Sequence, residues 1–215
     1  MVSSIPARQS RLTAMLPIRG RGTPRDPRHE IPWCTDRAFG MIGPMTWTVP
    51  VTTRTGGSLT APETELLPEY LAWHRGTFLH KCEGLTGEQL ALRPLPASSL
   101  SLLGLMRHLA KVERTWFRIR FAGADVPPLH FVEGHKDADF DLLEPEQAER
   151  EYLSLLEEQR LADATVAGAP LDRHLAAHGE EMSLRMTYLH VITEYARHNG
   201  HADLLREHID GVTGS

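Results

Sequence analysis

The stretch from Tyr188 to Gly211, YLHVITEYARHNGHADLLREHIDG, decides the fold of this chain. Its apolar residues recur at helical spacing, so the stretch predicts one long helix with one buried side. At about 100° per residue, Glu194 and His198 lie about 40° apart on this helix, within the arc of its apolar side chains. A carboxylate and an imidazole that face a core are costly unless they are paired or bind a metal. The helix therefore predicts a polar site inside a helical core.

Three more helices are predicted upstream, and the four together favour an all-α fold. They run from about residue 62 to 82, from 98 or 99 to 121 and from 145 to 166, and the last helix runs from about 183 to 211. Helices of this length joined by loops predict a four-helix bundle, a fold that carries metal sites on inward-facing side chains. No segment shows convincing strand alternation, apart from a short possibility near Leu129–Val132.

The first part of the chain differs from the rest in composition. Residues 1–57 are rich in Pro, Gly, Ser, Thr and Arg, and they show no lasting periodicity. This composition predicts a disordered N-terminal extension, followed by the helical domain over residues 58–215. An alternative is that Met45 is the natural start and that the residues before it are an upstream extension.

Charge and cysteine content narrow the classes of partner and compartment. The formal net charge of -5 argues against nucleic acid or an anionic membrane as the main partner. No apolar stretch approaches the length of about 20 residues that spans a bilayer. The only two cysteines, Cys34 and Cys82, do not suggest a disulfide framework, so the expected compartment is the cytoplasm.

A third candidate side chain lies on the second predicted helix. His108 falls at the edge of that helix's apolar side, where it can meet Glu194 and His198 across the bundle. Two imidazoles and one carboxylate match a catalytic zinc site better than a structural one, which closes its shell with four protein ligands. Nickel, cobalt or ferrous iron would also suit this set.

Other interpretations of these residues remain open. His108 is compatible with a hydrogen-bonded structural histidine, and Glu194 and His198 with a polar pair that holds no metal. His201 and Arg197 border the same face, and they are candidates for contacts with a substrate or thiol. His201 is also a possible replacement for one of the ligands.

Three motifs together carry a resemblance to a known family. They are SLLGLMRHLAKVERTWF at 101–117, EYARHNGHADLLR at 194–206 and IDGVTG at 209–214. They resemble the DinB-like superfamily, in particular its actinobacterial branch and the mycothiol-dependent maleylpyruvate isomerases. The resemblance covers residues 60–214 and leaves the N-terminal extension outside.

The resemblance implies a four-helix bundle that binds a divalent metal. Most members use three histidines, and Glu194 stands where the first histidine of a His-x-x-x-His pair is usual. The maleylpyruvate isomerases have a His/Glu/His set, which falls here on His108, Glu194 and His198. Glutamate is also a metal ligand. Its presence in place of the usual histidine therefore affects which metal is preferred more than whether a metal binds.

The resemblance also implies a function. Characterised members are mostly metal-dependent thiol S-transferases or isomerases that use mycothiol, bacillithiol or glutathione. We therefore expect zinc as the favoured metal, mycothiol and a small electrophile as substrates, and a homodimer. Two alternatives are a non-catalytic metal-binding or interaction bundle and a metal-dependent hydrolase that uses the same three ligands.

Overall fold

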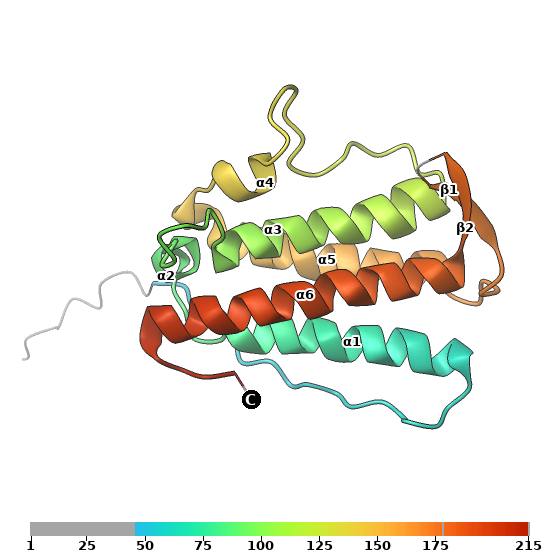
Figure 1. Cartoon of the computed structure of the whole chain (residues 1–215), viewed down its shortest axis with the longest axis horizontal. Helices are drawn as coiled ribbons and strands as arrows, with labels where there is room; N and C mark the ends of the chain where they lie inside the picture. The colour runs from blue at the N-terminus through green and yellow to red at the C-terminus, as the bar shows by residue number, and fades with distance from the viewer. Residues whose placement is uncertain (1–45, 178, 215) are drawn as a thin grey trace, which may run out of the picture. The chain divides into compact units, whose positions relative to one another are not determined.

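The computed structural model describes residues 46–177 and 179–214. The prediction of disorder for residues 1–45, and the alternative start at Met45, lie outside the described residues. Within them the chain is mostly helical, and its four long helical segments lie side by side (Figure 1). These segments are α1 (Glu63–Cys82), α3 (Leu102–Glu113) continued by the π-helix η1 (Arg114–Phe121), α5 (Ala148–Val166) and α6 (Leu184–Asp210). The shorter elements are α2 (Gly87–Ala91), α4 (Ala138–Asp141), the 3-10 helix η2 (Pro145–Gln147), and the strands β1 (His174–Ala177) and β2 (Glu180–Ser183).

The predicted last helix is confirmed as α6, and both of its ends have a local cause. The side chain of Ser183 accepts a hydrogen bond from the backbone N–H of Met186, which caps the first turn. Gly211 ends the helix with a φ of 79°, a left-handed conformation that glycine adopts without steric cost. Between these caps, α6 runs the full length of the helical layer and packs against α1 and α3.

The second predicted helix starts later than expected and changes geometry along its length. Its N-cap is Ser101, whose hydroxyl accepts from the backbone N–H of Gly104, so the helix begins after residues 98 and 99. The last eight residues form the π-helix η1, which apolar periodicity does not distinguish from an α-helix. Gly123 follows with a φ of 66°.

A buried polar network joins the four long segments at the centre of the fold. Arg75 donates to both carboxylate oxygens of Glu113 at 2.7 Å. The Tyr195 hydroxyl donates to Glu113 at 2.9 Å and accepts from Gln159 at 3.0 Å. These residues come from α1, α3, α6 and α5 in turn. The network therefore fixes the positions of the four helices relative to one another. Fully buried apolar side chains surround it, among them Leu71, Phe78, Leu105, Leu109, Leu155, Val191 and Leu205.

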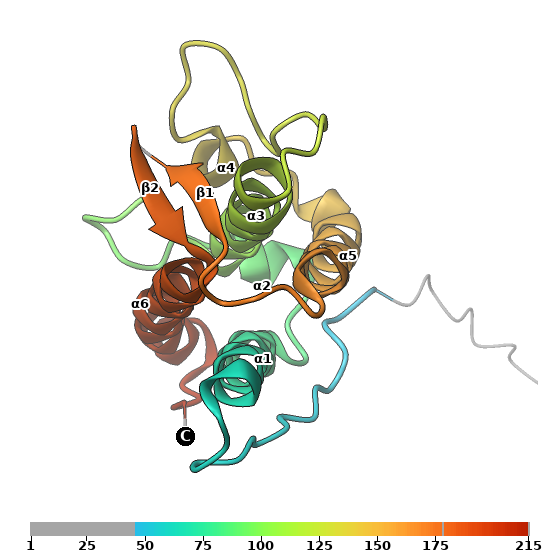
Figure 2. The same ribbon diagram turned by 90° about the vertical axis from the view of Figure 1, so that its right-hand side faces the viewer.

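The expectation that the chain has no strands is wrong for one hairpin. Strands β1 and β2 pair antiparallel, with His174 opposite Ser183 and Leu175 opposite Met182. Four-residue strands are too short for alternation to stand out in a sequence. The suggested strand near Leu129–Val132 is reduced to an isolated bridge between Val132 and His135. The hairpin lies at the end of the helical layer, against η1 and the start of α6 (Figure 2).

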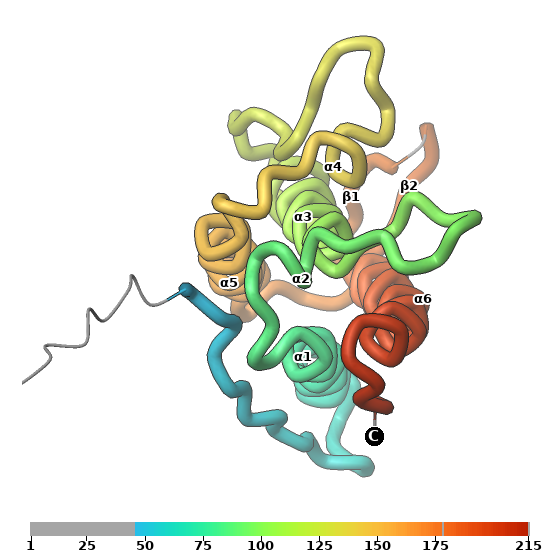
Figure 3. Tube along the Cα trace, turned by 90° about the vertical axis from the view of Figure 1, so that its left-hand side faces the viewer, coloured from blue at the N-terminus to red at the C-terminus, as the bar shows by residue number. Residues whose placement is uncertain are grey.

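Part of the predicted extension, within residues 46–57, is bonded to the helical part of the chain. Val49 is buried, and its backbone N–H donates to the carbonyl of Leu85 at 3.0 Å. Its carbonyl accepts from Gly84 at 2.9 Å. These hydrogen bonds involve only backbone atoms. Because side chains are not needed for them, the segment shows no periodic pattern in the sequence. Figure 3 shows the extended segment passing beside α1.

Among the described helices, none combines the length and the apolar character needed to cross a bilayer.

Candidate metal centre

Two antiparallel helical segments bring the three predicted ligands together. His108 comes from α3, while Glu194 and His198 lie one turn apart on α6. Each offers a donor atom, and these atoms all lie within 4.8 Å of one another. Oε2 of Glu194 lies 3.7 Å from Nε2 of His108 and 3.4 Å from Nε2 of His198. The carboxylate therefore lies close to both imidazoles.

These separations leave room for a cation among the three side chains. Both Glu194–histidine distances exceed the range of good N–H···O hydrogen bonds. Two ligands about 2.1 Å from a tetrahedral ion lie about 3.4 Å apart. Two imidazole nitrogens and one carboxylate oxygen are also donors that zinc and its neighbours accept. The residues present therefore fit one divalent ion.

His108 is oriented by a residue that sequence analysis missed. Its Nδ1 lies 2.9 Å from Oδ2 of the buried Asp139, on the short helix α4. Lys111 donates to the other oxygen of Asp139 at 3.2 Å. Burial alone would raise the pKa of Asp139, but its bonds to His108 and Lys111 outweigh burial and lower the pKa to about 2. The ionised carboxylate favours a proton on Nδ1 of His108, which leaves the Nε2 lone pair directed at the site.

His198 is held as a neutral imidazole. Burial, followed by the charge of His108, lowers its pKa to about 4, although Glu194 acts in the opposite direction. Its Nδ1 lies 3.2 Å from Nδ1 of His201, so its Nε2 is the nitrogen that faces Glu194. A neutral imidazole keeps the lone pair that a metal ion needs.

The two additional residues singled out in the sequence both contact the predicted ligands. His201 meets His198 through the nitrogen farther from Glu194, and the group of convergent donors in the described residues does not include it. Arg197 donates to Oε1 of Glu194 at 3.0 Å and is largely exposed. This bond occupies one carboxylate oxygen and leaves Oε2 to face the histidines.

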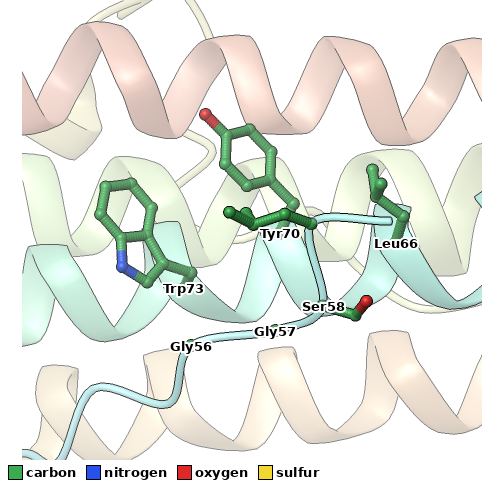
Figure 4. A pocket seen from close by; sticks show the side chains of 7 residues that line it. Gly56, Gly57, Ser58, Leu66, Tyr70 and Trp73 are labelled. Carbon is green, nitrogen blue, oxygen red and sulfur yellow. The ribbon is translucent and has the colours of Figure 1, made fainter. Parts of the chain in front are cut away.

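A different cavity, of about 390 Å³, lies between the segment around residue 57 and helix α1 (Figure 4). Tyr70 and Trp73 line it and stack with ring planes 4° apart. Its lining contains no imidazole, carboxylate or thiol. It therefore lacks the groups for the chemistry considered above.

Comparison with known proteins assigns the chain to a family. Residues 66–211 match the family described as Mycothiol-S-transferase. The chain belongs to the mycothiol S-transferase family. This family is DinB-like, so the superfamily resemblance found in the sequence is confirmed. No curated protein and no solved structure matches the chain.

The matched range contains every residue of the candidate centre. The predicted ligands His108, Glu194 and His198 lie inside it, as do Asp139 and His201. Membership of the mycothiol S-transferase family connects the chain with mycothiol-related thiol transfer. The donors of the candidate centre are therefore the natural place to look for that chemistry.

Proposed function

We propose that this chain is a divalent-metal-dependent mycothiol S-transferase whose ion is held by His108, Glu194 and His198. The observation that carries the proposal is the convergence of three donor atoms within 4.8 Å, from two helices of a chain in this family. Zinc is the favoured ion, because two imidazoles and one carboxylate form a set that catalytic zinc uses. An ion held by three protein ligands would still be able to bind a substrate sulfur.

The proposal extends to the architecture and setting of the protein. The four long helical segments α1, α3 with η1, α5 and α6 constitute a DinB-like four-helix bundle. The domain that carries the activity comprises the helical part of the chain. We also propose that the protein is a cytoplasmic homodimer. It acts on small molecules and has neither nucleic acid nor a membrane as its partner.

The side chains of the centre have separate tasks in this mechanism. The three ligands would hold a divalent ion, whose charge would lower the pKa of a bound thiol and favour the thiolate of mycothiol. Asp139 keeps the proton of His108 on Nδ1, and burial keeps His198 neutral, so both Nε2 atoms remain donors. Arg197 holds Glu194 by the oxygen that does not face the histidines.

The transfer itself is a nucleophilic step at the electrophile. The thiolate sulfur forms a bond to an electrophilic carbon of the second substrate. In a displacement, the leaving group departs with the electron pair of the broken bond. In an addition to a conjugated alkene, the electron pair moves onto the substrate and a proton from water completes the product.

Metal analysis and a conjugation assay on the same preparation test the proposal. We expect one divalent ion per chain and a conjugate of mycothiol with 1-chloro-2,4-dinitrobenzene that forms only when the ion is present. His108→Ala and Glu194→Ala should abolish conjugation. The control is His208→Ala, which changes an exposed histidine of α6 and should leave conjugation intact. Bound metal without conjugation would replace the proposal with a non-catalytic metal-binding bundle. Hydrolysis without thiol would indicate a hydrolase. A chain that binds no metal would refute all three readings.

A further inference from the structure

The cavity of about 390 Å³ beside α1 is bounded by a short segment, residues 56–59, which we call the strap (Figure 4). The strap is attached to α1 by a hydrogen bond, in which the backbone N–H of Ser58 donates to Oε2 of Glu69 at 2.8 Å. Gly57 permits this close approach, because a Cβ at that position would lie 2.6 Å from Cβ of Glu69. The cavity is therefore built from the strap and one face of α1.

Two parallel aromatic rings of α1 line this cavity. The rings of Tyr70 and Trp73 stack with their centroids 5.9 Å apart. Both rings pack against the ring of the buried His74, with centroids 4.8 and 4.9 Å away and planes nearly perpendicular to it. The side chain of Asn199 on α6 donates to the backbone carbonyl of His74 at 3.1 Å. Packing against this buried ring favours one orientation of each aromatic side chain before any ligand binds.

The lining of the cavity favours an uncharged ligand. It contains no lysine, arginine, histidine, aspartate or glutamate. Within the described residues, no protein group forms a hydrogen bond with the Tyr70 hydroxyl or the indole N–H of Trp73, so both are free to donate to a ligand. Leu59 is 90% exposed and Tyr70 is 47% exposed. A ligand in the cavity would therefore cover apolar surface that is now in contact with water.

We infer that this cavity binds a small, uncharged, planar aromatic compound that carries a hydrogen-bond acceptor. Aromatic rings pair favourably in offset-stacked arrangements, and Tyr70 and Trp73 offer parallel ring faces for them. A charged compound would lose hydration here without meeting a group of opposite charge. The volume of the cavity also lies within the usual range of small-molecule sites.

The site is separate from the candidate metal centre. Its lining comes from the strap and α1, while the three donors lie on α3 and α6. Binding in the cavity therefore requires neither a metal ion nor thiol transfer. The inference does not rest on the proposed function, and each can fail while the other holds.

Isothermal calorimetry of the metal-free full chain with 2-naphthamide tests the inference. This probe is planar and uncharged, and its carbonyl is a hydrogen-bond acceptor. We expect one molecule bound per chain. Decahydro-2-naphthamide keeps the amide without the flat rings, and 2-naphthoate keeps the rings but carries a charge. Each of these matched probes should bind about tenfold more weakly than 2-naphthamide.

Three variants locate the bound probe. Tyr70→Ala removes one of the parallel rings and should weaken binding of 2-naphthamide by about tenfold. Leu59→Ser changes a side chain that is almost fully exposed, so folding should be unaffected and binding should weaken by about threefold. Phe131→Ala is the matched control, because it removes an exposed aromatic ring that does not line this cavity. It should bind 2-naphthamide as the wild type does.

Several outcomes would overturn the inference. They are no binding of 2-naphthamide to the wild type, equal affinity for either matched probe, and unchanged affinity in both Tyr70→Ala and Leu59→Ser. A wild type that binds no 2-naphthamide but forms a dimer that Tyr70→Ala dissociates would make this surface a contact between two copies of the chain. Binding that Tyr70→Ala weakens, in a chain that forms no mycothiol conjugate, would support the cavity and refute only the proposed function.

Discussion

Asp139 accepts a hydrogen bond of 2.9 Å from His108 through Nδ1, the imidazole nitrogen that does not face Glu194. The contact links the long connection before α5 to the candidate metal centre. Arg107 strengthens this link, because its guanidinium donates to the carbonyl of Ala138, the first residue of α4, and to that of Leu142, which directly follows α4. The connection is therefore anchored to α3 at the point where it supports His108.

Asp139→Ala should weaken metal binding while the three predicted ligands remain in place. Loss of a hydrogen-bonded partner of a metal-bound histidine typically lowers metal affinity by about 10–100-fold. Competition with a chromophoric chelator measures the affinity of each variant for zinc. Asp137→Ala, which removes an exposed carboxylate two residues away, is the control. Equal zinc affinity in the Asp139 variant and the wild type would show that His108 does not need this partner.

The substitution of Glu194 tests whether this position acts as a ligand. Glu194→His restores the three-histidine pattern and should keep one ion per chain, with a changed order of affinity among divalent metals. Glu194→Leu leaves only two donors and should lose the ion, because a catalytic zinc site typically needs three protein ligands. Elemental analysis after dialysis measures the stoichiometry. Retention of the ion by Glu194→Leu would remove Glu194 from the ligand set.

Much of the candidate site follows from helical periodicity, while its supporting residues do not. Glu194 and His198 stand out because a period of 3.6 residues places them among apolar side chains. Asp139 lies in a connection without periodicity, and only the folded chain brings it to His108. The same reason hides Val49, which is held through backbone bonds. Four-residue strands such as β1 are too short to show an alternating pattern.

The stability of the metal-free protein should fall as the pH falls from about 6.5 to about 4. Burial lowers the pKa of His198 to about 4, and burial likewise lowers the pKa of His130 to about 4. Since the ordinary value is about 6.5, the unfolded chain binds more protons than the folded chain in this window. Protonation of these two histidines therefore favours unfolding.

Urea unfolding at pH 7, 5.5 and 4.5 in the presence of a chelator measures this dependence. His198→Gln should reduce the change in unfolding free energy between pH 7 and 4.5, because it removes one group that gains a proton on unfolding. His208→Gln changes an exposed histidine and serves as the control. A variant at His198 with the full pH dependence would contradict its burial as a neutral imidazole.

The buried network around Glu113 should matter to stability and not to metal binding. Arg75 and Glu113 have almost no exposed surface, and their side chains form a bidentate ion pair with bonds of 2.7 Å. Glu113→Leu leaves the buried Arg75 with Asp163, a largely exposed carboxylate 2.8 Å away, as its remaining ion-pair partner. The loss of the buried partner should cost about 3 kcal/mol of unfolding free energy. The double variant Arg75→Met with Glu113→Leu should regain much of this loss, because no buried charge remains. Urea unfolding of the wild type, the Glu113→Leu variant and the double variant measures these differences in stability. A double variant no more stable than Glu113→Leu would show that the ion pair stabilises the fold by more than the avoidance of an unpaired buried charge.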